Sequence, residues 1–224
     1  MKISIQKFFL LAVSFVSLHA FAQLKGSGKT LTKTYDFRGF DKINFEDLDG
    51  KIEVEVGKPF GITVTIDDNL YPLLEVLKND SNNLLIIRLK ANQNNKMYIE
   101  DTKIAIKVSL PMATFLKNDS NSNMNVVGIT GNYLKVATLD NGSTTLAGKI
   151  ENLETINNGN GVLNAKQLIV KNAKIKASGN GNVYVNVSDF IIAKTSGNCT
   201  VVCVGKAKFD VKSTSLGNSR FVNE

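Results

Sequence analysis

The sequence predicts an all-β fold. A strand-rich N-terminal unit with one short helix is followed by a short right-handed parallel β-helix, a solenoid whose rungs hold about 20 residues. Asparagine recurs every 18 to 20 residues through the second half, in turns that also hold glycine or serine: Asn121, Asn141, Asn160, Asn180, Asn198 and Asn218. Such a fixed spacing is typical of a solenoid, because each repeat stacks on the next. In the first half, apolar and polar residues alternate, which is typical of half-buried strands.

Residues 1–22 are expected to be a secretory signal peptide and not part of the fold. Lys2 and Lys7 give a positive start, residues 8–18 are apolar, and Ala20-Phe21-Ala22 has the small-x-small pattern of a cleavage site. Cleavage near Ala22–Gln23 would place the protein in the periplasm, at the cell surface or outside the cell. No later stretch approaches the ~20 apolar residues of a membrane helix, so a membrane-spanning protein is not expected.

Residues 23–34 are polar and rich in Gly, Ser and Thr, and we expect a flexible leader there. Residues 35–115 then form the N-terminal β unit. Its strands are predicted from apolar residues at every second position, at 43–45, 52–56, 62–66, 85–89 and 104–110. We expect antiparallel or meandering strands, with a hairpin turn at 47–50 and a hairpin loop at 91–96.

One helix is expected to interrupt these strands. Leu70, Leu73, Leu74 and Leu77 have the i, i+3, i+4, i+7 spacing of an apolar helix face, and Pro72 fits a first helical turn. The pattern predicts one to three turns of helix lying across a sheet edge.

Residues 116–224 form the repeats, with two short strands around each Asn turn and no helical periodicity. Glycine supplies positive φ angles at such turns, and asparagine tolerates them. Stacked Asn side chains can also hydrogen-bond to one another between rungs, as amide ladders do. A structural role for the Asn column is the favoured interpretation, and a row of amides that binds polysaccharide is the alternative.

The surplus positive charge lies entirely on the repeat half. Residues 23–116 hold 13 Lys and Arg against 13 Asp and Glu, whereas residues 117–224 hold 12 against 7. This surplus indicates either a solvated face or weak attraction to an anionic glycan or lipopolysaccharide. Nucleic acid is not an expected partner, because export separates the protein from it and no Arg cluster with interleaved aromatics occurs.

The sequence predicts no catalytic, cofactor-binding or metal-binding residues. The only histidine is His19, which excludes Ser-His-Asp and Cys-His machinery and histidine-ligated zinc from the mature chain. Calcium-binding β-rolls repeat every nine residues, unlike this chain. The segment Asp47-Leu48-Asp49-Gly50 lacks the downstream glutamate of a calcium loop.

Two smaller patterns have structural interpretations. Glu151, Lys171 and Asp189 take equivalent positions in successive repeats, which predicts a column of alternating charge. Cys199 and Cys203 would lie ~13 Å apart on one strand, too far for a disulfide, so we expect two buried thiols.

Several motifs resemble the bacterial GIN domain family, named "putative auto-transporter adhesin" head domains. They are Phe40-Asp41-Lys42-Ile43, Gly50-Lys51-Ile52-Glu53-Val54, Lys107-Val108-Ser109-Leu110-Pro111 and the Ser-Gly-Asn turns at 178–180 and 196–198. The resemblance covers about residues 36–221 and implies an all-β fold with a β-helix-like C-terminal part.

The functional expectation is an exported, non-enzymatic binding or structural protein of the cell envelope, adhesin-like. Its expected partner is an envelope polysaccharide or another envelope protein, and its oligomeric state is left open. A periplasmic module for envelope sensing or assembly is the alternative, and a carbohydrate-active β-helix enzyme is a third hypothesis.

Overall fold

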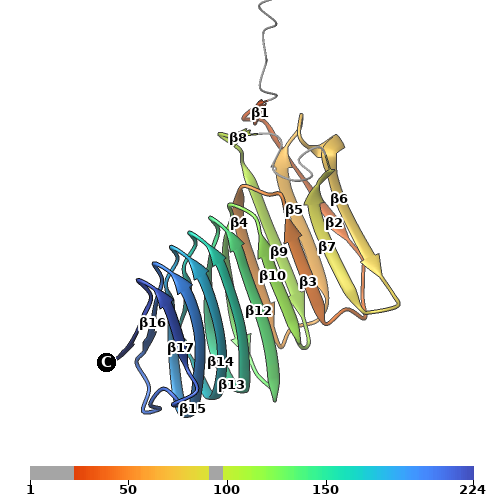
Figure 1. The fold of residues 1–224 in the computed structure, drawn as a ribbon. Helices are drawn as coiled ribbons and strands as arrows, with labels where there is room; N and C mark the ends of the chain where they lie inside the picture. Colours follow the sequence, from red (N-terminus) through yellow and green to blue (C-terminus); the bar gives the residue numbers. More distant parts are fainter. Residues whose placement is uncertain (1–22, 91–97) are drawn as a thin grey trace, which may run out of the picture.

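The computed structural model describes residues 23–90 and 98–224. The expected signal peptide and the expected loop at 91–96 lie outside the described residues. The described chain is built almost entirely of strands (Figure 1). Its first half contains β1 (Gln23–Lys25), β2 (Thr30–Tyr35), β3 (Lys42–Glu46), β4 (Gly50–Val56), β5 (Gly61–Asp67), β6 (Leu74–Asn79), β7 (Leu84–Leu89), β8 (Tyr98–Glu100) and β9 (Ile104–Leu110). Its second half contains β10 (Phe115–Asp119), β11 (Asn123–Ile129), β12 (Tyr133–Asp140), β13 (Ser143–Gly159), β14 (Leu163–Gly179), β15 (Val183–Gly197), β16 (Thr200–Cys203), β17 (Thr214–Gly217) and β18 (Arg220–Asn223).

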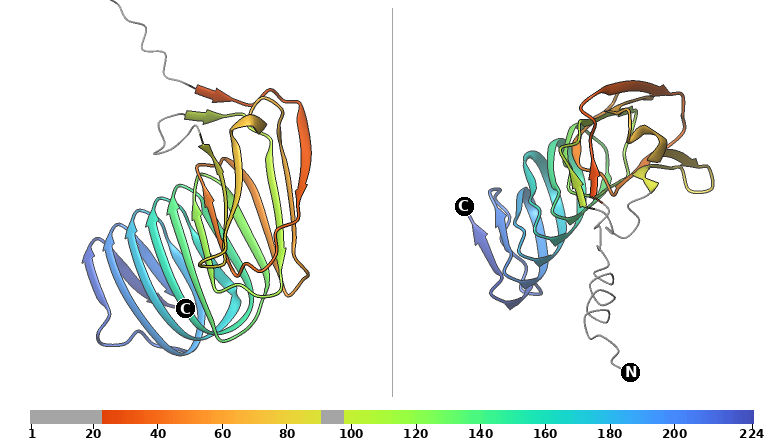
Figure 2. Two further views of the ribbon diagram at one scale, coloured as in Figure 1. Left: turned by 90° about the vertical axis from the view of Figure 1, so that its right-hand side faces the viewer. Right: turned by 90° about the horizontal axis from the view of Figure 1, so that it is seen from above.

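The strands stack into two walls that enclose one core. One wall, here called sheet I, runs in the order β6, β7, β3, β10, β12, residues 152–159 of β13, 172–179 of β14 and 190–197 of β15, then β17. The opposite wall, sheet II, runs β2, β5, β9, β4, β11, the first parts of β13, β14 and β15, then β16 and β18. The long strands β13 to β15 bend from one wall into the other, as Figure 2 shows. The C-terminal region is a β-solenoid of about five turns, as the sequence predicts.

The parallel stack extends further toward the N-terminus than expected. Antiparallel pairing joins β2 to β5, β5 to β9 and β6 to β7, whereas β3, β4, β7 and β9 pair with their neighbouring rungs in parallel. The expectation of antiparallel or meandering strands is therefore wrong for β3 and β4, and it holds on only one side of β7 and β9. Alternation with a period of two reports which face is buried and does not report strand direction, so the sequence could not separate the two cases.

The turn at residues 47–50 is also not a hairpin. It connects β3 in sheet I to β4 in sheet II, and these two strands do not pair with each other. Asp47 has a φ of 55°, and Leu48 points into the core with 1% of its surface exposed. The segment is a solenoid corner, the N-terminal equivalent of the later Asn turns.

The expected flexible leader at 23–34 contains two strands instead. β1 pairs in parallel with β8, and β2 pairs antiparallel with β5. The buried carboxylate of Asp67 accepts hydrogen bonds from the backbone N–H groups of Gly28 (2.8 Å) and Lys103 (2.6 Å), which ties the segment to the fold. β2 is an edge strand with both faces largely exposed, so its polar sequence resembles that of a loop although its backbone is paired.

The expected helix at Leu70–Leu77 is a single 3-10 turn, η2 (Tyr71–Leu73), followed by β6. Leu70 is buried, but Leu77 is 44% exposed, which a helix packed through all four leucines would not allow. β6 pairs antiparallel with β7 and so covers an edge of the stack. The backbone hydrogen bonds that β6 forms with this edge outweigh the local helical pattern.

The alternating apolar residues of the first half are buried, as the sequence predicts, and they form one continuous core with the inward residues of the repeats. Most polar side chains in the core lie near the corners, although Thr155 is buried in the middle of a sheet I strand, between Val136 and Ile175. The amide nitrogen of Asn118 donates to the carbonyl of Ser122 (2.9 Å), and that of Asn157 donates to the carbonyl of Gly161 (3.1 Å). These bonds satisfy backbone groups that the turns leave without a strand partner. Cys199 and Cys203 are free and buried, as expected.

Candidate functional site: the outer face of sheet I

The Asn column is a continuous ladder of side-chain hydrogen bonds. Each amide nitrogen donates to the amide oxygen one rung before it, in the pairs Asn141–Asn121 (3.1 Å), Asn160–Asn141 (2.8 Å), Asn180–Asn160 (2.8 Å), Asn198–Asn180 (2.9 Å) and Asn218–Asn198 (3.0 Å). The expected amide ladder is confirmed. Because these amides bond to one another, the column acts as a scaffold.

The glycines beside the ladder let the corners stack closely. A Cβ atom built on Gly161 would lie 1.8 Å from the carbonyl oxygen of Gly142, and one built on Gly181 would lie 2.0 Å from that of Gly161. No side chain fits at these positions without separating the rungs.

The expected charge column lies at the other edge, where the long strands bend. Glu151, Lys171 and Asp189 line one hollow of about 650 Å³, together with Lys149. Two acids and two lysines balance one another there, so this hollow carries no net charge. Its residues fit the structural interpretation of a charge-compensated column.

A row of aromatic and amide side chains crosses the outer face of sheet I. Tyr133, Asn152, Asn172 and Phe190 are register partners on four successive rungs. Tyr133 is 45% exposed and Phe190 is 40% exposed. Between them lies a shallow hollow of about 210 Å³, which these four residues line together with Leu153, Glu154, Ala173 and Lys174. We call the four register partners Tyr133, Asn152, Asn172 and Phe190 the aromatic–amide row.

Hydrogen bonds fix the polar groups of the row. The amide nitrogen of Asn152 donates to the carbonyl of Asn132 (3.0 Å), and that of Asn172 donates to the amide oxygen of Asn152 (3.1 Å). The hydroxyl of Tyr133 donates to Glu154 Oε2 (3.1 Å). The two amides and the ring of Tyr133 are therefore preorganised, and the ring of Phe190 lies at the other end of the row.

Glu154 remains ionised at the centre of this face. Lys135 Nζ lies 2.9 Å from Glu154 Oε1, and this hydrogen-bonded ion pair lowers the pKa of Glu154 below its usual value. The same bond raises the pKa of Lys135. The pKa of Tyr133 is raised, first by partial burial and then by its hydrogen bond to Glu154, so its hydroxyl stays protonated and can donate.

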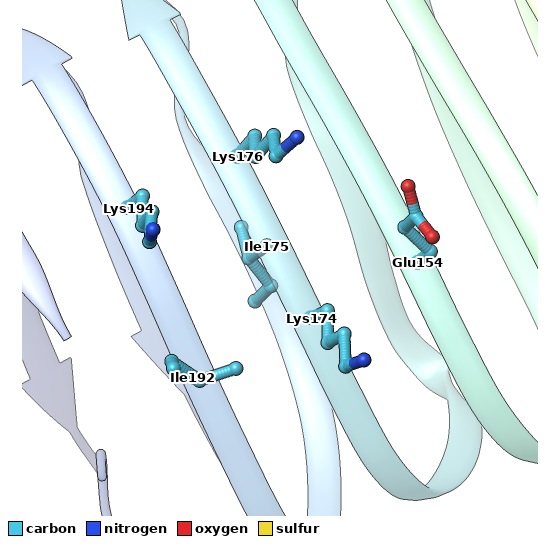
Figure 3. A pocket seen from close by; sticks show the side chains of 6 residues that line it. All are labelled: Glu154, Lys174, Ile175, Lys176, Ile192 and Lys194. Atoms are coloured by element: carbon cyan, nitrogen blue, oxygen red, sulfur yellow. The ribbon is translucent and has the colours of Figure 1, made fainter. Parts of the chain in front are cut away.

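A second hollow adjoins the first. It has a volume of about 260 Å³ and is lined by Glu154, Lys174, Ile175, Lys176, Ile192 and Lys194 (Figure 3). Glu154 and Lys174 line both hollows, so the two form one surface. Ile192, the register partner of Lys174, gives the hollow an apolar side, whereas the side chain of Ile175, between the two lysines of β14, points into the core.

The outer face of sheet II presents its aromatic residue differently. Lys166 Nζ lies 4.7 Å from the ring centroid of Tyr184 and also pairs with Glu224 at 3.8 Å. This cation covers one side of the Tyr184 ring, whereas both rings of the aromatic–amide row are exposed. Sheet I is therefore the better candidate for a binding face.

None of these side chains is a site residue predicted from the sequence. The signal was nevertheless present, because Tyr133, Asn152, Asn172 and Phe190 are separated by 19, 20 and 18 residues, close to the period of the Asn turns. Across 23–90 and 98–224, no three His, Cys, Asp or Glu residues group in a way that could hold a metal ion. The same ranges contain no helix with the length and apolarity needed to cross a membrane.

Comparisons with known proteins agree with this architecture. The family model described as "Putative auto-transporter adhesin, head GIN domain" matches residues 39–207. A search of the curated proteins finds no match. A crystal structure of a putative adhesin from Bacteroides fragilis NCTC 9343 is similar with a TM-score of 0.66 and 19% identity, covering 90% of this chain and 100% of that one. One from Parabacteroides merdae ATCC 43184 gives 0.54 and 17%, covering 91% and 99%. At these identities the similarity shows the fold alone.

Proposed function

The chain belongs to the GIN domain family of "putative auto-transporter adhesin" head domains, and on that premise we propose that it is an exported envelope protein that binds a polysaccharide along the outer face of sheet I. The role is adhesin-like attachment and does not include catalysis.

The aromatic–amide row is the observation that supports this proposal. An exposed aromatic ring offers a flat apolar surface to the C–H face of a sugar, and amides and a carboxylate offer donors and acceptors to its hydroxyl groups. The rings of Tyr133 and Phe190 stand three rungs apart, which is roughly 14 Å at ~4.8 Å per rung. This separation suits an extended chain of sugars better than a single ring.

The ionised state of Glu154, the one acid in the site, favours binding without catalysis. A general acid needs a raised pKa, whereas the ion pair with Lys135 lowers the pKa of Glu154. Glu154 is the only carboxylate that lines the two hollows of sheet I. The carboxylate pair that most glycoside hydrolases use is therefore not assembled in these two hollows.

The binding proposal is tested with a panel of envelope and host glycans and the double variant Tyr133→Ala/Phe190→Ala. Loss of both rings should weaken binding about tenfold or more, because each substitution removes a ring–sugar contact worth about 1 kcal/mol. The matched control is Tyr184→Ala, which removes an aromatic side chain from sheet II and should leave binding within twofold. Equal losses in the two variants would contradict a site on sheet I.

A surface location is the remaining part of the proposal. Protease added to intact cells should cleave the protein, and cell fractionation should recover it with the envelope. Complete protection in intact cells would contradict the adhesin-like role and favour a periplasmic module for sensing or assembly.

A further inference from the structure

Three lysines gather beside the aromatic–amide row, and Glu154 is the one acid that lines the same hollow. Lys174 and Lys176 are two positions apart on β14, so their side chains lie on the same face, and Lys194 on β15 is the register partner of Lys176. Figure 3 shows all three on the same side of the two strands, around the hollow that they line. Within residues 23–90 and 98–224, none of the three forms an ion pair with an acid.

Within the cluster, Lys174 stands opposite Glu154 on the neighbouring strand, whereas Lys176 and Lys194 stand opposite each other. Elsewhere, neighbouring strands place a lysine beside an acid, as in Lys107–Glu53 (3.0 Å), Lys117–Glu46 (3.5 Å) and Lys135–Glu154 (2.9 Å). Like charges directly opposite each other on neighbouring strands destabilise a sheet. The Lys176–Lys194 pair therefore costs stability in the free protein, and an anion placed between the two would remove that cost.

Glu154 does not neutralise the cluster, although it lines the same hollow. Its two oxygens are engaged by Lys135 (2.9 Å) and by the hydroxyl of Tyr133 (3.1 Å). Its single negative charge is shared between Lys135, which holds it in a hydrogen-bonded ion pair, and Lys176, whose charge also lowers the pKa of Glu154. One carboxylate cannot balance all of these lysines, so the hollow keeps a net positive charge beside the apolar side chain of Ile192 and attracts an opposite charge.

We infer that Lys174, Lys176 and Lys194 bind oxyanion groups of the ligand, so that the polysaccharide is an acidic one that carries carboxylate, sulfate or phosphate groups. This inference rests on the proposed function and adds the charge class of its ligand. Lysine ammonium groups are compact charges on flexible stems, which suits a repeated anion better than one rigid bidentate group. Lys174 lines both hollows, so a sugar chain held by the aromatic–amide row would extend directly onto the cluster.

The test uses oligosaccharides of one length in uronate, sulfated, phosphorylated and neutral forms, with poly-L-glutamate as a non-saccharide polyanion. Binding is measured at low salt and during a salt titration. The variant Lys174→Gln/Lys176→Gln/Lys194→Gln removes the cluster while keeping side-chain length. The control Lys51→Gln/Lys206→Gln/Lys208→Gln makes the same change in net charge with exposed lysines elsewhere.

The wild-type protein should bind at least one acidic form ten times more tightly than its neutral counterpart. The cluster variant should lose that tenfold preference and most of the salt dependence, and the control should stay within twofold of wild type. The three acidic forms identify which oxyanion is preferred.

Other results overturn the inference in distinguishable ways. Equal binding of acidic and neutral forms, or an unchanged cluster variant, would overturn it and leave the proposed function standing if Tyr133→Ala/Phe190→Ala still weakens binding about tenfold or more. If the control variant lost as much affinity as the cluster variant, the net charge of the protein and not the position of these three lysines would determine binding. That result would also overturn the inference. Binding of poly-L-glutamate as tight as that of the best saccharide would exclude the saccharide class. Failure to bind any saccharide would overturn the proposed function, and this inference with it.

Discussion

The contribution of a single residue to this fold depends on its neighbours in the rung above and the rung below. Asn160 donates a side-chain hydrogen bond to Asn141 and accepts one from Asn180, although all three are exposed to solvent. A neutral hydrogen bond contributes about 1 kcal/mol on average, so the ladder stabilises the stack through many small terms. The same stacking brings carboxylates together at the N-terminal corner, where Asp47 lies near Asp119, Glu46 and Asp140.

That corner makes stability depend on pH. Partial burial, followed by repulsion from the three neighbouring carboxylates, raises the pKa of Asp47 to about 6. Because the folded pKa is higher than the unfolded value, ionising Asp47 destabilises the fold progressively as the pH rises from about 4 to 6, and the full cost remains at pH 7.5.

Asp47→Asn should therefore stabilise the protein at pH 7.5 by about 1 kcal/mol, a value reduced from the full shift because the group is partly solvated. Asparagine also tolerates the φ of 55° at this position. The gain should vanish near pH 4, as measured by urea unfolding at both pH values. A difference between the variant and wild type that is the same at both pH values would refute the assignment, and the exposed Asp189→Asn serves as the control.

The sequence predicts a strand correctly where burial of every second side chain determines it. It fails where backbone pairing with a neighbouring strand determines it. Alternation located β3, β4, β5, β7 and β9, because each places every second side chain in the core. The edge strands β2 and β6 were missed, because their formation depends on backbone bonds to a neighbour that the local sequence does not reveal. For the same reason, the sequence did not show that β3 and β4 continue the parallel stack.

Glycine substitutions separate close stacking from backbone strain within these elements. Gly161→Ala should cost about 3 kcal/mol or more, because the new Cβ would lie 1.8 Å from the carbonyl oxygen of Gly142 and force two rungs apart. Gly57→Ala should cost only about 1 to 2 kcal/mol, because its φ is +83° but its nearest heavy atom is 4.0 Å away.

Urea unfolding of both glycine variants measures the difference. Equal costs would show that the rungs can separate easily and that the glycines serve only to form the turns.

At the scale of the whole molecule, the solenoid converts a sequence period into flat rows of side chains. The aromatic–amide row follows the Asn period and could have been read from the sequence once the strands were aligned. Lys176 and Lys194 have the same 18-residue spacing as Asn172 and Phe190, so the same alignment places them opposite each other. The alignment itself could not be read from the sequence, because the register shifts where β14 and β15 bend, between Ala165 and Ile169 and between Val170 and Asn172.

Methyl NMR of isoleucine-labelled protein tests most directly whether the ligand lies on the outer face of sheet I. Ile192 lies in the lysine-lined hollow, and Ile169, which is 53% exposed, lies in the charge-balanced hollow at the bend. On titration with the tightest-binding oligosaccharide of the panel, the methyl signals of Ile192 should shift and saturate with the binding isotherm, while those of Ile169 stay in place. Shifts at Ile169 with none at Ile192 would contradict the account.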